Sequence, residues 1–342
     1  MMDKRYRLWL LGGGLSGKIH GSLFERIASF KNLLHAWFEF RKGKRKRRDV
    51  QEFEFNLEDN LLQLHEELTA KSYLHSQYTQ FYVTDPKLRR INKATVRDRV
   101  VHQAVFRILT LIFEPSFIFD SYSCRVDKGT HVAVSRLDHF AHLGSGNNWK
   151  NVFALKLDIR KFFDSVDHEI LLRLIEHRVN DPETLWLVGL ILDSFPVGLP
   201  LGNVTSQLFA NIYLNELDQF VKHRLQIKYY LRYCDDFVAL FNTQEDLQEY
   251  LMAVREFLDQ ELKLTLHPSK IIIRTYRQGI DFLGYVVRPY CRTLRTKTKR
   301  RILKKVNQTN LQSYLGVLQH CDGYVIRQKL IRLCGDTLAM LA

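Results

Sequence analysis

The chain has 342 residues, and its 51 Lys and Arg against 37 Asp and Glu give a formal net charge of +14. Such an excess favours a polyanionic partner, with nucleic acid ahead of an acidic membrane surface. Five scattered cysteines without metal-type spacing argue against a zinc module and fit a reducing cytosol, and no apolar run is long enough to span a membrane. We therefore expect a cytoplasmic protein, built as one large domain or as two to three lobes around a shared core.

Residues 1–48 are expected to form a basic N-terminal extension. Within it, LGGGLSGKI at Leu11–Ile19 matches part of the phosphate-loop pattern, but Ile19 stands where that pattern needs Ser or Thr, so a flexible leader is the better interpretation. Apolar residues at helical spacing predict an amphipathic helix over Ser22–Phe40. Arg41–Arg48 carries seven basic residues in eight, which fits either a solvated linker or contacts with phosphate groups.

The next section combines helices with a strand pair. A helix is predicted over Leu57–Ala70, followed by a strand, a turn at Asp85-Pro86 and a second strand leading to a helix within Tyr78–Arg99. Val100–Phe113 is strongly apolar and is predicted to be a core helix. Gly, Ser and Asn gather in His142–Lys150, which we expect to be a loop that ends this section.

Tyr229–Phe241 (YYLRYCDDFVALF) predicts a hairpin, because two apolar, β-prone runs flank the adjacent Asp235 and Asp236. Two like charges at a tight turn repel each other. A divalent cation removes this repulsion, since Mg²⁺ prefers carboxylate oxygens. The alternative is an ordinary solvated turn, in which Asp is common.

A second acidic segment favours the metal interpretation. Leu155–His168 reads LKLDIRKFFDSVDH, in which the alternation of apolar and polar residues ends at Asp158, as at a strand that leads into a helix. A carboxylate at a strand end can face the hairpin aspartates. Three carboxylates from two strands suit the two-metal arrangement for in-line phosphoryl transfer. In so basic a chain, this acidic focus points to a nucleic-acid enzyme.

A third motif lies between these two, where Gly198–Asn211 reads GLPLGNVTSQLFAN. In order and spacing, the three motifs resemble those of reverse transcriptases, and YCDD resembles their Tyr-x-Asp-Asp box. Most reverse transcriptases have Gln-Gly and then Ser-Pro in the third motif, whereas this chain has Leu201-Gly202 and then Ser206-Gln207. The variant is similar to that of reverse transcriptases of diversity-generating retroelements, which copy a template RNA with errors concentrated at adenines. The resemblance covers about residues 53–324.

The resemblance implies an α+β fold of the right-hand polymerase type. Residues 49–150 would form the fingers, and residues 151–287 would form a palm of antiparallel sheet backed by helices. Residues 288–342, which begin with a strongly basic stretch, would form a short helical thumb that grips the template–primer duplex.

The implied reaction is DNA synthesis on an RNA template, in which a primer 3′-hydroxyl attacks the α-phosphate of a deoxynucleoside triphosphate. Asp158, Asp235 and Asp236 would hold two Mg²⁺ ions, for which Mn²⁺ could substitute, and Ile159 would add its backbone carbonyl. Asp158 and Asp235 are expected to bind directly, and Asp236 to contribute more weakly. Lys270 would approach the pyrophosphate, either as a general acid or through its charge alone.

Other residues are implied as contacts of the incoming nucleotide. Arg89 matches the triphosphate clamp, with Lys87 and Arg99 as weaker candidates, and the alternative for Arg99 is an ion pair with a neighbouring acid. Phe163 matches the steric gate that excludes a ribose 2′-hydroxyl. The alternative is that Phe163 is an ordinary core phenylalanine beside Phe162.

The third motif would contact template and nucleotide through Leu201, Gly202 and Gln207. A glutamine in place of Leu201 would hydrogen-bond near the nucleotide sugar or the template base, which an aliphatic side chain cannot do. Losing a positioned hydrogen bond should cost discrimination on the order of 1 kcal/mol, so we expect a less faithful polymerase.

The expected partners are a template RNA, a DNA primer or cDNA, deoxynucleoside triphosphates and a small basic helical accessory protein, with no membrane partner. Within the family, the diversity-generating type is favoured. The alternative is a reverse transcriptase of an antiphage defence, retron or group II-like system. A catalytically silent RNA-binding scaffold is a further alternative, against which the intact acidic triad argues.

Overall fold

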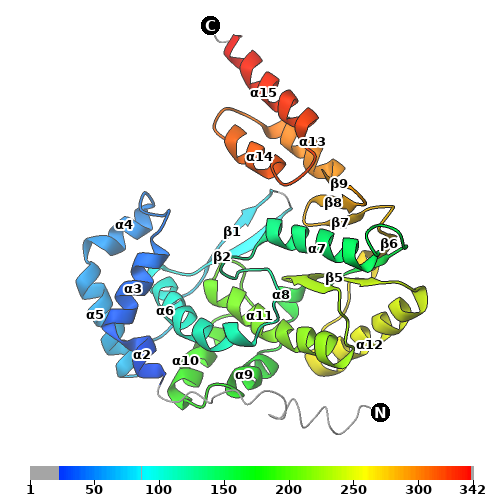
Figure 1. Cartoon of the computed structure of the whole chain (residues 1–342). Helices are drawn as coiled ribbons and strands as arrows, with labels where there is room; N and C mark the ends of the chain where they lie inside the picture. The colour runs from blue at the N-terminus through cyan, green and yellow to red at the C-terminus, as the bar shows by residue number, and fades with distance from the viewer. Residues whose placement is uncertain (1–22, 86, 340–342) are drawn as a thin grey trace. The chain divides into compact units, whose positions relative to one another are not determined.

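The computed structural model describes residues 23–85 and 87–339, so the phosphate-loop-like segment Leu11–Ile19 and Pro86 of the predicted turn lie outside the described residues. The chain divides into two compact units, each assembled from separate stretches of sequence (Figure 1). Unit 1 holds the described residues up to Ile118, with Arg160–Gln219 and Phe257–Thr265. Unit 2 holds Phe119–Ile159, Phe220–Glu256 and the residues from Leu266 onward.

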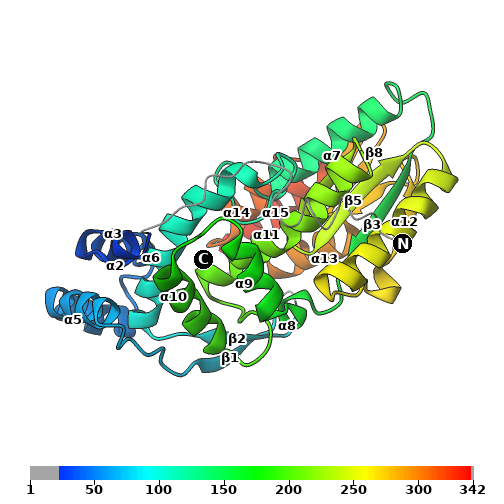
Figure 2. The same cartoon turned by 90° about the horizontal axis from the view of Figure 1, so that it is seen from below.

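Unit 1 consists of helices and one antiparallel strand pair. Its elements are α2 (Phe24–Ala28), α3 (Phe30–Phe40), α4 (Arg48–Phe55), α5 (Leu57–Thr69), β1 (Thr79–Val83), β2 (Arg89–Lys93), α6 (Val96–Phe113), α8 (Phe162–Ser165), α9 (His168–Glu176), α10 (Pro182–Asp193) and α11 (Val204–Gln219). The long helix α6 packs against α3 and α11 (Figure 2). The β1–β2 hairpin and α6 confirm the strand–strand–helix pattern predicted for this part of the chain.

The helix predicted over Ser22–Phe40 is broken at Ser29. This residue has a ψ of 139°, which is extended, and its hydroxyl accepts a hydrogen bond from the Asn32 amide, so it ends α2 and caps α3. Helix α4 is not predicted from the sequence. It begins at Arg48, and residues 41–47 form turns that link it to α3, so the basic segment is a short connection between two helices.

Unit 2 contains two antiparallel sheets and several helices. Its elements are α7 (Thr130–Gly144), β3 (Phe153–Asp158), β4 (Tyr230–Tyr233), β5 (Asp236–Phe241), α12 (Gln244–Leu262, which ends in unit 1), β6 (Ile272–Thr275), β7 (Ile280–Phe282), β8 (Tyr285–Arg288), β9 (Cys291–Leu294), α13 (Thr296–Lys305), α14 (Leu311–Leu318) and α15 (Tyr324–Ala339). The larger sheet has the strand order β4-β5-β3-β6, and the smaller has the order β7-β8-β9. The predicted mixture of helices with antiparallel sheet is confirmed.

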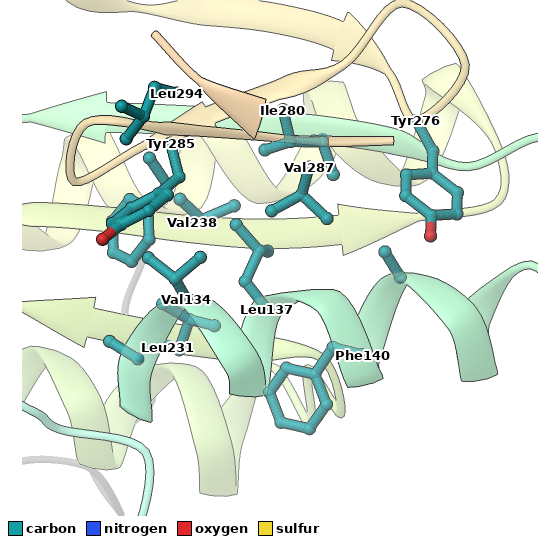
Figure 3. Packing of buried hydrophobic residues seen from close by; sticks show 14 of the residues in the cluster. Val134, Leu137, Phe140, Leu231, Val238, Tyr276, Ile280, Tyr285, Val287 and Leu294 are labelled. Carbon is teal, nitrogen blue, oxygen red and sulfur yellow. The ribbon is translucent and has the colours of Figure 1, made fainter. Parts of the chain in front are cut away.

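The core of unit 2 is formed by α7 and the two sheets. Figure 3 shows Val134 and Leu137 of α7 beside Leu231 and Val238 of the larger sheet and Val287 of the smaller one. Each fully buried side chain of this kind stabilises the fold by roughly 1.5–3 kcal/mol. This packing fixes strands β4 and β5, and with them the acidic turn that connects the two strands.

The last three helices, α13 to α15, confirm the helical character predicted for the C-terminal part of the chain. Across residues 23–85 and 87–339, no helix combines the length and the apolar character needed to cross a membrane.

Candidate active site

The β4–β5 hairpin places Asp235 and Asp236 at its turn, as predicted. Strand β4 ends at Tyr233 and β5 begins at Asp236. Cys234 has a φ of +56°, a left-handed conformation that is typical of tight hairpin turns. In the register of β3 and β5, Asp158 is the direct partner of Asp236. The three aspartates therefore meet at one end of the larger sheet, within unit 2.

Backbone contacts hold this end of the sheet together. The Ile159 N–H donates to the Asp235 carbonyl oxygen at 3.3 Å, and the His267 N–H donates to the Asp158 carbonyl oxygen at 2.8 Å. Ile159 is also bridged to Leu266 on its other side. The residue predicted to lend its carbonyl to a metal thus lies on buried backbone beside the aspartates.

Burial and the repulsion between like charges shift the pKa values of Asp235 and Asp236. Burial raises the pKa of Asp235, and the charge of Asp158 raises it further. Burial also raises the pKa of Asp236 to about 6, against the opposing effect of the Lys156 ammonium. Because burial and repulsion disfavour the ionised carboxylates, a positive charge nearby stabilises the site.

Two lysines bring positive charge to this site. Lys270 Nζ donates to Asp158 Oδ1 at 2.6 Å, and Lys156 Nζ lies 3.0 Å from Asp236 Oδ2. Asp236 Oδ1 is buried and has no hydrogen-bond partner among the described residues. Lys270 is a predicted site residue, whereas sequence reasoning misses Lys156. Its signal is its place in β3, two residues before Asp158 and so on the same face of the strand.

The oxygen donors at this end of the sheet suit hard divalent cations such as Mg²⁺. Asp158 and Asp235 fit best, because a cation would relieve the repulsion that raises the pKa of Asp235. In the part of the chain that the structure describes, no three His, Cys, Asp or Glu side chains are grouped closely enough to hold a metal ion. Asp158 and Asp236 instead form ion pairs with their lysines.

The third motif lies in unit 1, against strand β2. The Asn92 amide donates to the Leu201 carbonyl oxygen at 3.0 Å. Gly202 has a φ of +122°, and a Cβ atom there would lie 3.0 Å from the Asn92 carbonyl oxygen, so a larger residue would be strained. Helix α11 then begins at Val204. Gln207 is exposed in its first turn.

Gly202 and Gln207 belong to the wall of a pocket of about 300 Å³ in unit 1, which sequence reasoning does not reveal. Its wall also holds the aromatic rings of Phe40 and Phe81 and four cationic side chains from three separate segments, namely Lys44, Arg47, Lys93 and Arg99. Two of these cations come from the basic segment 41–48. We call this the cationic pocket.

Charge is crowded in the cationic pocket. Asp49 accepts from Lys93 at 2.7 Å and from Arg99 at 2.8 Å. Arg99 therefore forms an ion pair with a neighbouring acid, which is the alternative to the triphosphate contact. Burial lowers the pKa of the Lys44 ammonium, and the charges of Arg99 and Arg47 lower it further. The pocket therefore favours an anionic ligand.

The remaining predicted site residues also lie in unit 1. Arg89 opens β2, Lys87 lies in the turn before it, and both side chains are exposed. Phe162 is buried, whereas Phe163 is only half-buried, and their rings are 5.3 Å apart. The core phenylalanine is therefore Phe162, and the role of Phe163 as a steric gate stays a prediction.

One family model matches a stretch of the chain that contains the antiparallel sheet with its acidic turn and also the third motif. The model, described as "Reverse transcriptase (RNA-dependent DNA polymerase)", covers residues 83–287, which include all the predicted site residues. The chain belongs to this family, which confirms the resemblance to reverse transcriptases in general, and its class is RNA-directed DNA polymerase. The family is one of right-hand polymerases that use divalent metal ions.

Individual relatives are distant and are connected with introns in several cases. Protein YkfC of Escherichia coli K12 is 25% identical over 266 residues, which cover 65% of this chain and 69% of YkfC. Group II intron-encoded protein LtrA of Lactococcus lactis is 24% identical over 306 residues, which cover 68% of this chain and 50% of LtrA. A putative COX1/OXI3 intron 2 protein of Saccharomyces cerevisiae is 20% identical over 271 residues, which cover 60% of this chain and 31% of that protein. The chain thus spans about half of LtrA.

Proposed function

We propose that this chain synthesises DNA on an RNA template by two-metal nucleotidyl transfer. The observation that supports the proposal best is the meeting of Asp158, Asp235 and Asp236 at one end of the larger sheet, in a chain of the reverse transcriptase family. The substrates would be a template RNA, a DNA primer or cDNA, and deoxynucleoside triphosphates.

In this proposal Asp158 and Asp235 hold two Mg²⁺ ions, or Mn²⁺ in their place, with help from the Ile159 carbonyl. The ions would activate the primer 3′-hydroxyl and neutralise charge on the leaving pyrophosphate. Lys270 would stabilise the same leaving group, as a general acid or by its charge alone. Asp236 contributes less directly, because Lys156 already pairs with one of its oxygens.

The features of unit 1 suit the binding of the nucleic-acid strand and of the deoxynucleoside triphosphate. The cationic pocket fits a nucleic-acid backbone, because its cations can contact phosphate groups while Phe40 and Phe81 contact a base or sugar. Arg89 and Lys87 would bind the triphosphate. Phe163 would exclude nucleotides that carry a 2′-hydroxyl.

We further propose that the enzyme is of the diversity-generating type, in which LGNVTSQ and above all Leu201 lower fidelity on a template RNA. It would then work with a small basic helical accessory protein. Residues 49–150, 151–287 and 288–342 would act as fingers, palm and thumb. The intron proteins among the relatives favour a group II-like enzyme as the second candidate, next to retron and antiphage-defence types.

Primer extension on a mixed-sequence RNA, with Mg²⁺ and all four deoxynucleotides, tests the proposal. We expect the wild type to extend the primer and Asp235→Asn to lose extension by more than about 1,000-fold, because it removes a charge that holds the metal. Asp259→Asn, which changes an exposed aspartate on α12, is the matched control and should extend like the wild type. Full extension by Asp235→Asn would contradict the proposal, and RNA binding without any extension would favour the silent scaffold.

Sequencing of the same products tests the subtype. Errors concentrated opposite template adenines and reduced by Leu201→Gln would support the diversity-generating type, because glutamine restores a hydrogen bond near the nucleotide. A low and uniform error rate that Leu201→Gln leaves unchanged would favour the group II-like, retron or defence candidates.

A further inference from the structure

The segment Tyr73–Tyr78 of unit 1 joins α5 to β1 without regular secondary structure, yet it is firmly held. The Tyr73 hydroxyl donates to Asp98 Oδ1 at 2.8 Å, and the Ser76 amide lies 3.2 Å from Asp98 Oδ2. Asp98 is fully buried in α6. The segment is therefore anchored to a core helix at two points, and we call it the brace.

Two histidines connect the brace to the third motif. His102 Nδ1 lies 2.6 Å from the Thr205 hydroxyl, and His102 Nε2 lies 3.0 Å from His75 Nε2. His75 Nδ1 in turn lies 2.6 Å from the Ser76 carbonyl oxygen. Burial lowers the pKa of His102 to about 3, so this ring is neutral.

One arrangement of protons satisfies these three contacts when both rings are neutral. A carbonyl oxygen can only accept, so His75 Nδ1 carries the proton and His75 Nε2 is an acceptor. His102 Nε2 must then donate to it, which leaves His102 Nδ1 as an acceptor. The Thr205 hydroxyl therefore donates to His102, and its proton is directed into the protein.

A second chain of hydrogen bonds runs from the same motif to the brace. The Ser194 hydroxyl donates to the Ile191 carbonyl oxygen at 2.6 Å, so its oxygen accepts from the Tyr78 hydroxyl at 3.0 Å. The Tyr78 oxygen in turn accepts from Asn203 Nδ2 at 2.9 Å. Asn203 is buried, so loss of this bond would leave a polar group unsatisfied.

The two chains divide the residues of the motif between two sides. Gly202, Val204 and Gln207 line the cationic pocket, which the ring of His102 also borders, whereas the intervening Asn203 and Thr205 are bonded to the brace and to His102. Asn203 and Thr205 thus hold the backbone of the motif in place, and the same backbone carries the residues that line the pocket.

We infer that the brace positions residues 201–207 for the selection of nucleotides, and that His75, His102 and Tyr78 are positioning residues for this selection. The inference rests on the proposed polymerase function. Displacement of the motif would loosen the fit of template and nucleotide, while the aspartates of unit 2 would be unchanged. The cost should therefore fall on KM and fidelity more than on kcat.

His102→Gln and His102→Leu form a matched pair, because glutamine offers one acceptor and one donor whereas leucine offers neither. We expect His102→Leu to raise the KM for the correct deoxynucleotide and the misincorporation frequency by about tenfold, with kcat changed by less than about threefold. His102→Gln should stay within about threefold of the wild type in all three. Equal behaviour of the two variants, or a loss confined to kcat, would overturn the inference.

Tyr78→Phe tests the second chain and serves where His102→Leu does not fold. It removes one hydroxyl from a partly exposed ring, so that Asn203 Nδ2 loses its acceptor and the Ser194 oxygen loses the hydrogen bond that it accepts. We expect KM and misincorporation to rise by about fivefold, with kcat preserved. Wild-type values of KM and misincorporation would count against the inference.

The directions of the hydrogen bonds are measurable on the free protein by long-range ¹H–¹⁵N NMR at pH 8, where ordinary imidazoles are neutral. We expect the Nδ1–H tautomer for His75 and the Nε2–H tautomer for His102, with each signal identified by its loss in the corresponding Gln variant. The opposite tautomer at either ring would overturn the assigned directions. Because this measurement needs no substrate, its outcome is separate from any failure of the proposed polymerase activity.

Discussion

Asp236 and Lys156 carry opposite charges and are both largely buried in the larger sheet. The side chain of Asp236 is 20% exposed and that of Lys156 is 15% exposed, so neither charge is well hydrated. Burial works against ionisation of Asp236, and the ammonium 3.0 Å away partly compensates. Lys156 Nζ also lies 5.8 Å from the ring centre of Phe282, a favourable cation–π distance. The pair therefore stabilises the sheet only while both partners are present.

We predict that Lys156→Met destabilises the protein in a pH-dependent way. Asp236 has a raised pKa of about 6 in the folded state against an ordinary value of 3.8, and removing the ammonium raises it further. At pH 8 the folded variant must therefore either hold an uncompensated carboxylate or take up a proton, and we expect a loss of about 3 kcal/mol in the free energy of unfolding. Near pH 5, where Asp236 is largely protonated in the folded state, the loss should be smaller. Urea unfolding at pH 5 and pH 8 measures both values.

The double variant Lys156→Met/Asp236→Asn is the control, because it removes both charges. It should recover most of the stability that Lys156→Met loses at pH 8. Equal destabilisation at the two pH values, with no recovery in the double variant, would mean that Lys156 acts by packing and not by charge.

At the scale of elements, the connection from α10 to α11 holds α8 in place. The Leu199 amide donates to the Phe163 carbonyl oxygen at 2.6 Å. Gly198 has a φ of +71°, and a Cβ atom there would lie 2.1 Å from that same oxygen and 2.8 Å from the Asp164 Cα atom. The backbone at the half-buried Phe163 therefore packs so closely against residue 198 that only a glycine fits there.

We predict that Gly198→Ala lowers the free energy of unfolding by about 2–4 kcal/mol, because the methyl group meets backbone atoms that cannot yield cheaply. Gly189→Ala within α10 is the matched control, since a Cβ atom there meets nothing within 4 Å. It should be neutral or should stabilise by up to about 1 kcal/mol, as alanine favours helix. Chemical denaturation of both variants measures the difference, and equal stabilities would contradict the close packing.

Over the whole molecule, the net charge of +14 provides a general attraction for nucleic acid. The structure separates the basic residues that line the cationic pocket from those that do not. Lys44 and Arg47 line the cationic pocket, whereas Lys42 and Arg45 of the same segment are not part of its wall. Charges of the same sign and the same sequence neighbourhood should therefore differ in what they contribute to binding.

We predict that Lys44→Gln/Arg47→Gln lowers the salt dependence of RNA binding, with the slope of log K against log salt reduced by about 1.4, or 0.7 for each lost phosphate contact on a single strand. The double variant Lys42→Gln/Arg45→Gln removes the same charge outside the pocket and should change the slope by less than half as much. Fluorescence anisotropy of a labelled RNA over a range of KCl concentrations measures the slopes. Equal effects of the two pairs would assign the binding to the segment as a whole.

Local sequence patterns were sufficient for the strongest elements of the fold. The hairpin around Asp235 follows from two β-prone runs and a short turn, and α6 follows from a long apolar run, so both were predictable. The break at Ser29 was missed because apolar spacing continues across it, while the serine hydroxyl caps the following helix. Helix α4 was missed because its acidic and basic composition resembles that of a solvated linker.

The sequence by itself determined the family, the order of the acidic motifs and the residues that carry charge at each of them. Only the tertiary structure decided which of these charges meet. Lys156 reaches Asp236 through the register of β3 with β5, and the cationic pocket joins residues between Phe40 and Gln207, which no local pattern connects. The physical reason is that propensity and periodicity act over a few residues, whereas ion pairs, buried hydrogen-bond chains and pockets depend on strand register and helix packing between distant segments.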